Sequence, residues 1–413
     1  MRKKSVVLLS VVLCLVMAMS LFGCGAPAAT TPAPAPAAPD APAVDAPAAP
    51  EAPASTEVVK VGWLGSLTGD SAVYGIASSN SVKMFFEDLN KEGGLLGRQV
   101  EVICYDTKGD AGEAVNAAKR LTGQDKVIAI IGPNASGHVI ALASVMEEMQ
   151  IPNISEIATN PKATVGDDGK VNPFTYRACF IDPYQGAVAA GFASDTLGVK
   201  KAAIFYDISS DYSQGLVQFF EEGFLAKGGE IVAKEAYKTG EVDFRAQLTK
   251  IKEAQPEIIF APFFFKDAAL FSKQARELGI TATFLGGDGW SSDQLVPMAG
   301  DAVEGAYFVT HLDYQDATVK EYLAKYEGKY NMTLAVAAGF LSWDASVMLA
   351  DAVNRANSLD PIEINKALES CDVQGVTGRI KISADTHNPE GKDAIILQIV
   401  DGAYSFVEKY SVQ

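Results

Sequence analysis

Histidine is scarce in this sequence, and the patterns on which most enzymes depend are missing. The 413 residues include only three histidines, His138, His311 and His387, and each stands alone. No group of Cys, His and Asp has the spacing of a metal site. No G-x-S-x-G occurs, and no Gly-Lys pair is followed by the Ser or Thr of a phosphate-binding loop. These absences argue against an enzyme with a metal, a serine nucleophile or a bound nucleotide.

Cysteine is also rare and forms no redox or metal motif. Cys14 and Cys24 lie near the start of the chain, whereas Cys104, Cys179 and Cys371 are spread through the remainder. These last three are an odd number and include no C-x-x-C. One disulfide and three unpaired thiols therefore both fit the sequence.

Basic residues are too few to balance the acidic ones. The chain has 34 Lys and Arg against 51 Asp and Glu, a formal net charge of −17. Such an acidic surface argues against nucleic acid or an anionic membrane face as a partner. After the first residues, no stretch approaches the ~20 apolar residues of a membrane span, so we expect the remainder to be soluble.

The beginning of the chain resembles a bacterial lipoprotein signal. The basic segment MRKK precedes an apolar run that ends in LFGC, and the last residue is Cys24. The resemblance implies that residues 1–23 are removed and that Cys24 carries a lipid. The lipid would anchor the protein at the outer face of the bacterial cytoplasmic membrane, on the extracellular or periplasmic side. A transmembrane anchor is the alternative, but the apolar run is shorter than the ~20 residues of a span.

Residues 24–56 are dominated by Ala and Pro. Such a composition buries little apolar surface and favours extended polyproline II. The segment has Asp40, Asp45 and Glu51 but no Lys or Arg. We expect a disordered, semi-stiff tether between the lipid and a globular body that begins near Glu57.

The body alternates short apolar runs with helical patterns. Its length, about 355 residues, is long for one core and predicts two lobes. Several runs are apolar throughout, as strands covered on both faces are. The strand-helix-strand order predicts an α/β fold with two Rossmann-like lobes built on parallel sheets. We expect strands at 58–64, 100–106, 127–132, 201–207, 257–263, 282–287 and 306–310.

The alternation pauses at 166–186 and 299–314, where we place two crossings between the lobes, at about Arg177 and Phe308. A third crossing near Lys392 would send the last two strands into the second lobe. A three-segment hinge would then join the lobes. The predicted lobe 1 is 57–177 with 308–392, and the predicted lobe 2 is 178–307 with 393–413.

Ligands of open α/β sheets bind beyond the carboxyl ends of the strands, so residues directly after each predicted strand are site candidates. They are rich in hydroxyls, small residues and aromatics, and they include one conspicuous acid, Asp288. Ser136 would begin a helix, where its hydroxyl and the free amides suit a carboxylate. A nucleophilic Ser136, with His138 two residues further on, lacks an orienting acid and is the weaker interpretation.

Seven segments of the body carry a resemblance to known proteins: VGWLGSLTGDSAVYG, GGLLGRQVEVICYDTKGD, IIGPNASG, IPNISEIATNP, DYSQG, FLGGDGW and GDAVEGAYF. Together they resemble one family, the extracellular solute-binding proteins of branched-chain amino acid ABC transporters, of the leucine/isoleucine/valine type. The resemblance covers Val58 to Tyr410 and implies the type I periplasmic binding protein fold. It also implies a monomer without enzymatic activity or cofactor, which delivers an amino acid to the permease subunits of an ABC importer.

The resemblance further implies roles for individual residues. Ser136 and the loop after the short strand would bind the ligand carboxylate, and Asp288 the ammonium group. Aromatic residues would surround the side chain. An alternative role for Asp288 is a turn residue, because Asp-Gly is common in turns. The implied ligand-binding residues are Tyr74, Ser136, Ile157, Ala158, Thr159, Tyr212, Phe264, Phe265 and Asp288, and Trp290 is expected at the rim.

The nature of the ligand stays open at this point. The aromatic candidates are apolar, and Lys266 is the only Lys or Arg among the strand-end residues, which favours an apolar amino acid. An aromatic acid, an amide or urea is an alternative ligand. A ligand-sensing module of a membrane signalling system is an alternative function.

Overall fold

The structure, a computed structural model, describes residues 57–411. The predicted signal sequence, Cys24 and the whole of the Ala/Pro-rich segment lie outside the described residues. Within 57–411, none of the helices combines the length and the apolar character needed to cross a membrane.

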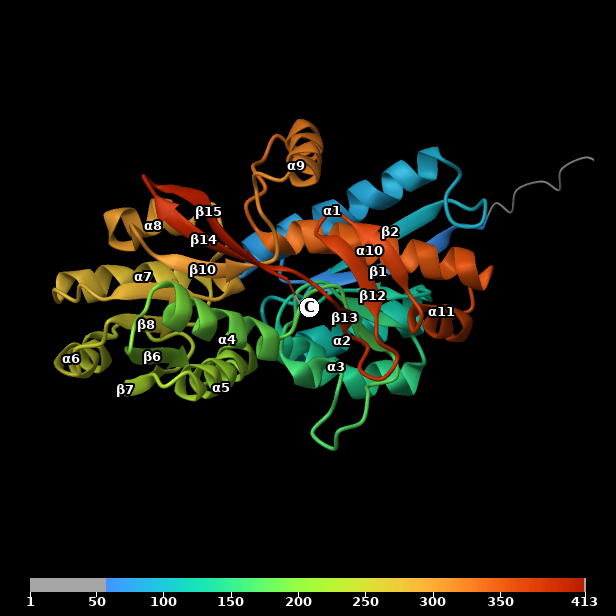
Figure 1. Cartoon of the computed structure of the whole chain (residues 1–413). Helices are drawn as coiled ribbons and strands as arrows, with labels where there is room; N and C mark the ends of the chain where they lie inside the picture. Colours follow the sequence, from blue (N-terminus) through green and yellow to red (C-terminus); the bar gives the residue numbers. More distant parts are fainter. Residues whose placement is uncertain (1–56, 412–413) are drawn as a thin grey trace, which may run out of the picture. The chain divides into compact units, whose positions relative to one another are not determined.

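A parallel sheet of five strands, in the order β2-β1-β3-β4-β5, is formed within residues 59–177. Strand β1 is buried almost throughout because helices cover both faces of the sheet. Helix α1 packs with α10 on one face, and α2 packs with α3 on the other (Figure 1). The bounds are β1 (Val59–Gly65), α1 (Ala72–Lys91), β2 (Val100–Asp106), α2 (Ala111–Arg120), β3 (Ile130–Ile131), α3 (Ser136–Met149), β4 (Asn153–Ser155), β5 (Thr175–Arg177) and α10 (Ala337–Ala356).

A second sheet has seven strands in the order β15-β14-β10-β9-β8-β6-β7. Strands β6 to β10 run parallel, and β14 and β15 add an antiparallel edge. Helices α4 and α5 cover one face, and α6 and α7 cover the other. The bounds are α4 (Asp182–Gly191), β6 (Lys201–Asp207), α5 (Asp211–Ala226), β7 (Glu230–Tyr237), α6 (Arg245–Glu253), β8 (Ile258–Ala261), α7 (Phe265–Glu277), β9 (Thr283–Gly286), α8 (Leu295–Ala299), β10 (Tyr307–Thr310), β14 (Ala394–Val400) and β15 (Ala403–Tyr410).

A small antiparallel sheet, β11-β12-β13, lies between α11 and β14 in the sequence and was not predicted. Its strands are short and mix charged with apolar residues, so they give little periodic signal. Strand β11 packs against α10, which extends the cover of the first sheet. The remaining bounds are α9 (Ala317–Tyr330), α11 (Pro361–Leu368), β11 (Asp372–Gly375), β12 (Gly378–Ile382) and β13 (Pro389–Glu390).

The predicted α/β fold is confirmed, with two differences in detail. The expected run of parallel strands ends in the antiparallel edge β14-β15, which the hairpin turn at Asp401 and Gly402 allows. Strand β10 continues across the crossing predicted at Phe308, so the chain leaves this sheet after Thr310.

Arg177, at the end of β5, fixes the loop that follows β4. Its side chain is fully buried, and its guanidinium donates to the carbonyl oxygens of Ala158 at 2.5 Å and Asn160 at 2.9 Å. A buried cation needs such partners, because water no longer solvates it. The same bonds hold the loop backbone in one conformation. The three cysteines of the described residues, Cys104, Cys179 and Cys371, are free thiols.

Candidate ligand-binding site

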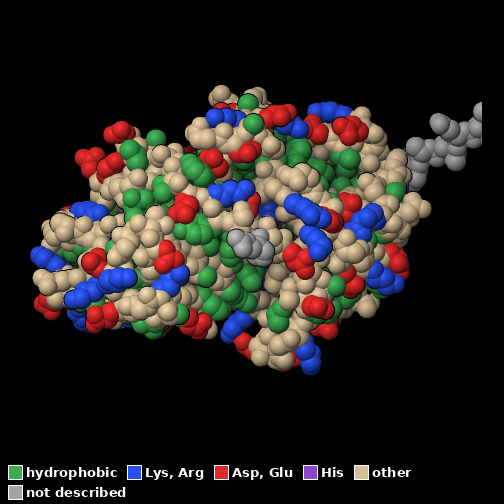
Figure 2. All heavy atoms as spheres, viewed as in Figure 1, with side chains coloured by type: hydrophobic (Ala, Val, Ile, Leu, Met, Phe, Trp, Pro, Cys, Tyr) green, Lys and Arg blue, Asp and Glu red, His purple; other side chains and the backbone are tan. Residues whose placement is uncertain are grey.

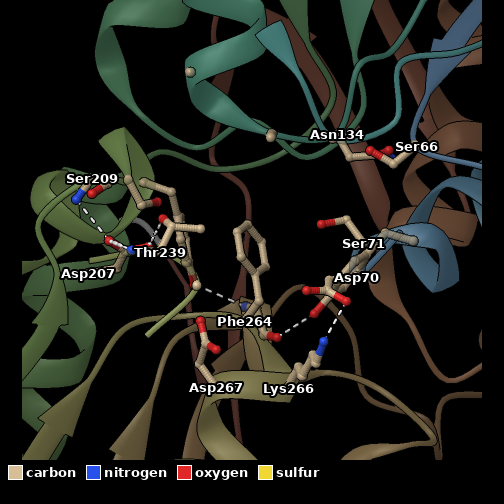
Figure 3. Close-up of a pocket in the computed structure, with 18 of the residues that line it drawn as sticks. Ser66, Asp70, Ser71, Asn134, Asp207, Ser209, Thr239, Phe264, Lys266 and Asp267 are labelled. Atoms are coloured by element: carbon tan, nitrogen blue, oxygen red, sulfur yellow. Dashed lines mark hydrogen bonds and ion pairs between the residues drawn. The ribbon is translucent and has the colours of Figure 1, made fainter. Parts of the chain in front are cut away.

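A cavity of about 520 Å³ lies between the carboxyl ends of the two larger sheets. Most of its lining comes from the segments after strands β1 to β4 and β6 to β9, as expected for open α/β sheets (Figure 3). In both sheets the cavity lies where the strand order reverses, between β1 and β3 and between β6 and β8. The volume is in the range of sites for small molecules.

Three aromatic side chains form one wall of the cavity, which we call the aromatic wall. Phe264 stacks on Tyr212 with ring centroids 5.2 Å apart, and the ring of Tyr74 lies 5.5 Å from that of Phe264. The hydroxyl of Tyr74 donates to the backbone oxygen of Gly289 at 2.6 Å. Since Tyr74 belongs to α1 and Gly289 follows β9, this bond joins the parts of the chain that carry the two sheets.

Asp288 lies at the inner end of the cavity and is only 3% exposed. One carboxylate oxygen accepts hydrogen bonds from Gln185 Nε2 and Tyr212 Oη, both at 2.9 Å. The other lies 3.0 Å from His311 Nε2. A buried carboxylate needs such donors to remain charged. Three donors leave room for a further hydrogen bond from a ligand, because a carboxylate has about four acceptor positions.

Two residues close to Asp288 in sequence, Gly287 and Trp290, fix the position of this segment. A side chain at Gly287 would place its Cβ 2.5 Å from Tyr212 Oη, so glycine allows Tyr212 to reach Asp288. The prediction that Trp290 lies at the rim was wrong. Its indole is fully buried and donates to the backbone oxygen of Ala261 at 2.8 Å, which anchors the segment to the end of β8.

Ser136 begins helix α3 and lines the cavity. Its hydroxyl accepts a hydrogen bond from the backbone amide of Asn160 at 3.3 Å. The first amides of a helix have no partner within the helix, and the helix dipole favours an anion there. Among the described residues, no hydrogen bond joins Ser136 to His138, so the geometry does not support Ser136 as an activated nucleophile.

The loop after β4 contributes only in part. Ile157 lines the cavity. Both backbone groups of Ala158 are occupied, since its amide donates to Ser155 Oγ and its carbonyl accepts from Arg177. The hydroxyl of Thr159 is buried and lies near the carboxyl group of Asp182, and Thr159 is not among the lining residues.

The structure thus brings most, but not all, of the sequence-predicted residues to the cavity. Ala158 and Thr159 lie behind the lining. Phe265 is buried in the core, with its ring 5.7 Å from that of Tyr74. Those that line the cavity are Tyr74, Ser136, Ile157, Tyr212, Phe264 and Asp288.

Glu156 is fully buried beneath the cavity, next to Ile157 in sequence. One of its oxygens accepts a hydrogen bond from Ser78 Oγ at 2.9 Å and another from the side-chain amide of Asn134, a lining residue. The other has no partner among the described residues. Removal from water disfavours the charged form and raises the pKa of Glu156 to about 7, against an opposing effect of its hydrogen bonds.

The lining carries an excess of negative charge, with six carboxyl groups and two lysines. Figure 3 shows Asp207 beside Thr239 on one side of Phe264, and Asp70 paired with Lys266 on the other. This excess disfavours an anionic ligand and favours one with an ammonium group. On the face shown in Figure 2, by contrast, acidic and basic side chains are interspersed. The lining acids are Asp70, Asp207, Asp211, Glu241, Asp267 and Asp288.

Sequence reasoning missed two residues that hold Asp288. His311 directly follows β10, so the rule of strand ends could have identified it. Gln185 lies inside α4, where nothing in the sequence distinguishes it from other helical residues. Within residues 57–411, no group of three or more His, Cys, Asp or Glu side chains is placed to hold a metal ion.

Comparison with known proteins agrees with this fold. Residues 58–403 match the family described as periplasmic binding protein. The chain belongs to this family. An amino acid binding protein of Pseudomonas aeruginosa is 31% identical over 328 residues, which span 78% of this chain and 85% of that protein.

Solved structures of two other family members confirm the predicted type I periplasmic binding protein fold. The leucine binding protein LivK of Thermotoga maritima is 33% identical, with a TM-score of 0.77 over 85% of this chain and 98% of that one. The branched-chain amino acid transporter substrate binding protein LivJ of Streptococcus pneumoniae, solved with isoleucine, is 30% identical. Its TM-score is 0.78, over 86% of this chain and 99% of LivJ.

Proposed function

We propose that this protein binds an amino acid with an apolar side chain, most readily a branched-chain one, and delivers it to an ABC importer. The proposal rests on the position of Asp288, whose buried carboxylate lines the cavity beside the aromatic wall. This combination provides one charged group for an ammonium and apolar surface for a side chain.

In the proposed complex, Asp288 pairs with the ligand ammonium and Ser136 with the ligand carboxylate. The free amides at the start of α3 add hydrogen bonds to the carboxylate. The hydroxyl of Thr159, which lies behind the lining near the carboxyl group of Asp182, is a further candidate donor. The side chain of the ligand packs against the aromatic wall.

Closure of two lobes would trap the ligand and present a shape that the importer recognises. We propose that the lobes are those expected from the sequence, except that the second crossing follows Thr310 and not residue 307, which gives 57–177 with 311–392 and 178–310 with 393–413. The bond from Tyr74 to Gly289 and the ion pair of Lys266 with Asp70 would form on closure. A ligand that touches both lobes favours the closed state because it binds that state better.

Two observations separate this ligand from the alternatives. The excess of carboxyl groups in the lining disfavours an aromatic acid, whose only charge is negative. An amide or urea has no positive charge to pair with Asp288. The relatives named above are amino acid and leucine binding proteins by description, and LivJ was solved with isoleucine.

A thermal-shift panel tests the proposed ligand class. Leucine, isoleucine or valine at a hundredfold excess over Kd should stabilise the protein by about 2.7 kcal/mol and raise its melting temperature. Glutamate, lysine, urea and 4-hydroxybenzoate should leave the melting temperature unchanged. A shift with glutamate or urea alone would contradict the apolar amino acid, although the fold would stand.

We also propose that Cys24 carries a lipid that anchors the protein outside the cytoplasmic membrane. The support is the basic, apolar and LFGC pattern of the first residues. Expressed in a bacterium that processes lipoproteins, the wild-type protein should be found in the membrane fraction, and Cys24→Ala in the soluble exported fraction. Equal distribution of the two proteins would contradict the anchor.

A further inference from the structure

His311 contacts the proposed ammonium-binding acid from the side opposite the other donors. It directly follows β10, and its side chain is fully buried. Its ring stacks on Phe180, with centroids 3.7 Å apart and planes 25° apart. Its Nε2 lies 3.0 Å from one oxygen of Asp288, while Gln185 and Tyr212 hold the other oxygen.

The two nitrogens of the His311 ring have different environments. Nδ1 is buried and has no hydrogen-bond partner among residues 57–411. An N–H at this position would be a buried donor without an acceptor, which is unfavourable. A neutral ring with its proton on Nε2 avoids that cost and donates to Asp288.

The charged groups near the ring also bear on its protonation. Burial lowers the pKa of His311, and the ammonium of Lys392 lowers it further, while Asp288 opposes both. The other titratable groups that interact with Asp288 are Tyr74, Tyr212, Asp182 and Cys179. Burial is the largest of these influences on the ring and favours its neutral form at neutral pH.

We propose that His311 is a positioning residue for Asp288, which orients the carboxylate through a neutral hydrogen bond and leaves its negative charge for the ligand ammonium. The inference rests on the proposed function. A positively charged His311 ring would neutralise the carboxylate of Asp288 and so weaken its attraction for the ligand ammonium. A neutral donor holds the carboxylate without that competition, so amino-acid binding should weaken when the ring becomes protonated.

Nuclear magnetic resonance of ¹⁵N-histidine-labelled protein tests the neutral state without any variant. The chain has three histidines, and the spectrum of His311→Gln identifies the signal of His311. At pH 7 we expect a neutral ring with the proton on Nε2, both before and after addition of leucine. A positively charged ring, or a proton on Nδ1, would overturn the inference.

Binding of leucine to His311→Gln and His311→Phe, measured by calorimetry between pH 5 and pH 8, tests the role. Glutamine replaces Nε2–H with a donor that never becomes charged, so affinity at pH 8 should stay within about fivefold of wild type. Phenylalanine keeps the stacking but removes the donor, and should weaken binding about ten- to a hundredfold. The wild-type protein should lose affinity towards pH 5 more steeply than His311→Gln.

The outcomes separate the inference from the proposed function. If wild type binds leucine and His311→Phe binds equally well, His311 does not position Asp288. If both variants lose affinity equally and keep the wild-type pH profile, the role of His311 is structural only. If wild type binds no amino acid, the proposed function fails and the inference fails with it.

Discussion

Replacing Asp288 by alanine is expected to weaken leucine binding by tens- to thousands-fold. Removal of one partner of a buried charge pair costs about 2–5 kcal/mol, because the other charge is left desolvated and unpaired. In this protein the partner would be the ligand ammonium, enclosed beside the aromatic wall. Calorimetric titration of leucine into wild-type and Asp288→Ala protein measures the difference.

The same substitution should also destabilise the empty protein. Asp288 accepts hydrogen bonds from Gln185 and Tyr212 and contacts His311, so alanine would leave these buried groups unpaired. The titration therefore has to be made at a temperature where the variant is shown to be folded. Asp70→Ala is the matched control, since Asp70 lines the cavity but is largely exposed, and its one ion pair among the described residues is with Lys266. We expect the control to change the binding free energy by less than about 1 kcal/mol. Near wild-type affinity of a folded Asp288→Ala protein would remove Asp288 from the site.

Replacing Glu156 by glutamine should remove a large part of the pH dependence of stability. The pKa of Glu156 is raised by burial from 4.5 to about 7 in the folded protein. The folded state therefore binds the proton more tightly than the unfolded state. This group favours folding below pH 4.5, and its contribution is lost as the pH rises to 7 and above. A shift of this size corresponds to about 3 kcal/mol.

Denaturant unfolding at pH 4.5 and pH 8, without ligand, measures this contribution. Other buried acids, such as Asp182 and Asp344, have pKa values raised by burial and add to the same trend. The relevant quantity is thus the change in unfolding free energy between pH 4.5 and pH 8. This change should differ between wild type and Glu156→Gln by about 3 kcal/mol. Glu148→Gln, an exposed position on α3, serves as the control and should follow wild type. If the unfolding free energy of Glu156→Gln depends on pH as that of wild type does, burial of Glu156 does not disfavour its ionised form, which would contradict the prediction.

The rule that ligands lie beyond strand ends predicted the inner part of the site from the sequence. Ser136 and Asp288 follow β3 and β9, and both line the cavity. The rule works because parallel strands end at the same edge of a sheet, so residues distant in sequence meet there. It would also have indicated His311, which follows β10.

Contacts between distant residues account for what the sequence did not predict. The backbone of Ala158 is occupied because Arg177, 19 residues away, donates to its carbonyl. The burial of Trp290 depends on the absence of a side chain at Gly286, where an added Cβ would lie 2.3 Å from the indole. Gln185 reaches Asp288 from a position 103 residues away. Such pairings come from tertiary packing, which local sequence patterns do not encode.

The central claim is that the cavity holds an amino acid by its ammonium and carboxylate groups at once. Calorimetric titration with leucine, leucinamide and 4-methylpentanoate tests it most directly, because the last two compounds each lack one of these charges and keep the same side chain. We predict measurable binding of leucine, and binding at least about tenfold weaker for each analogue, since each loses a charge-assisted interaction. Binding of either analogue as tightly as leucine would contradict recognition of that end, and tighter binding of both would exclude an amino acid as the ligand.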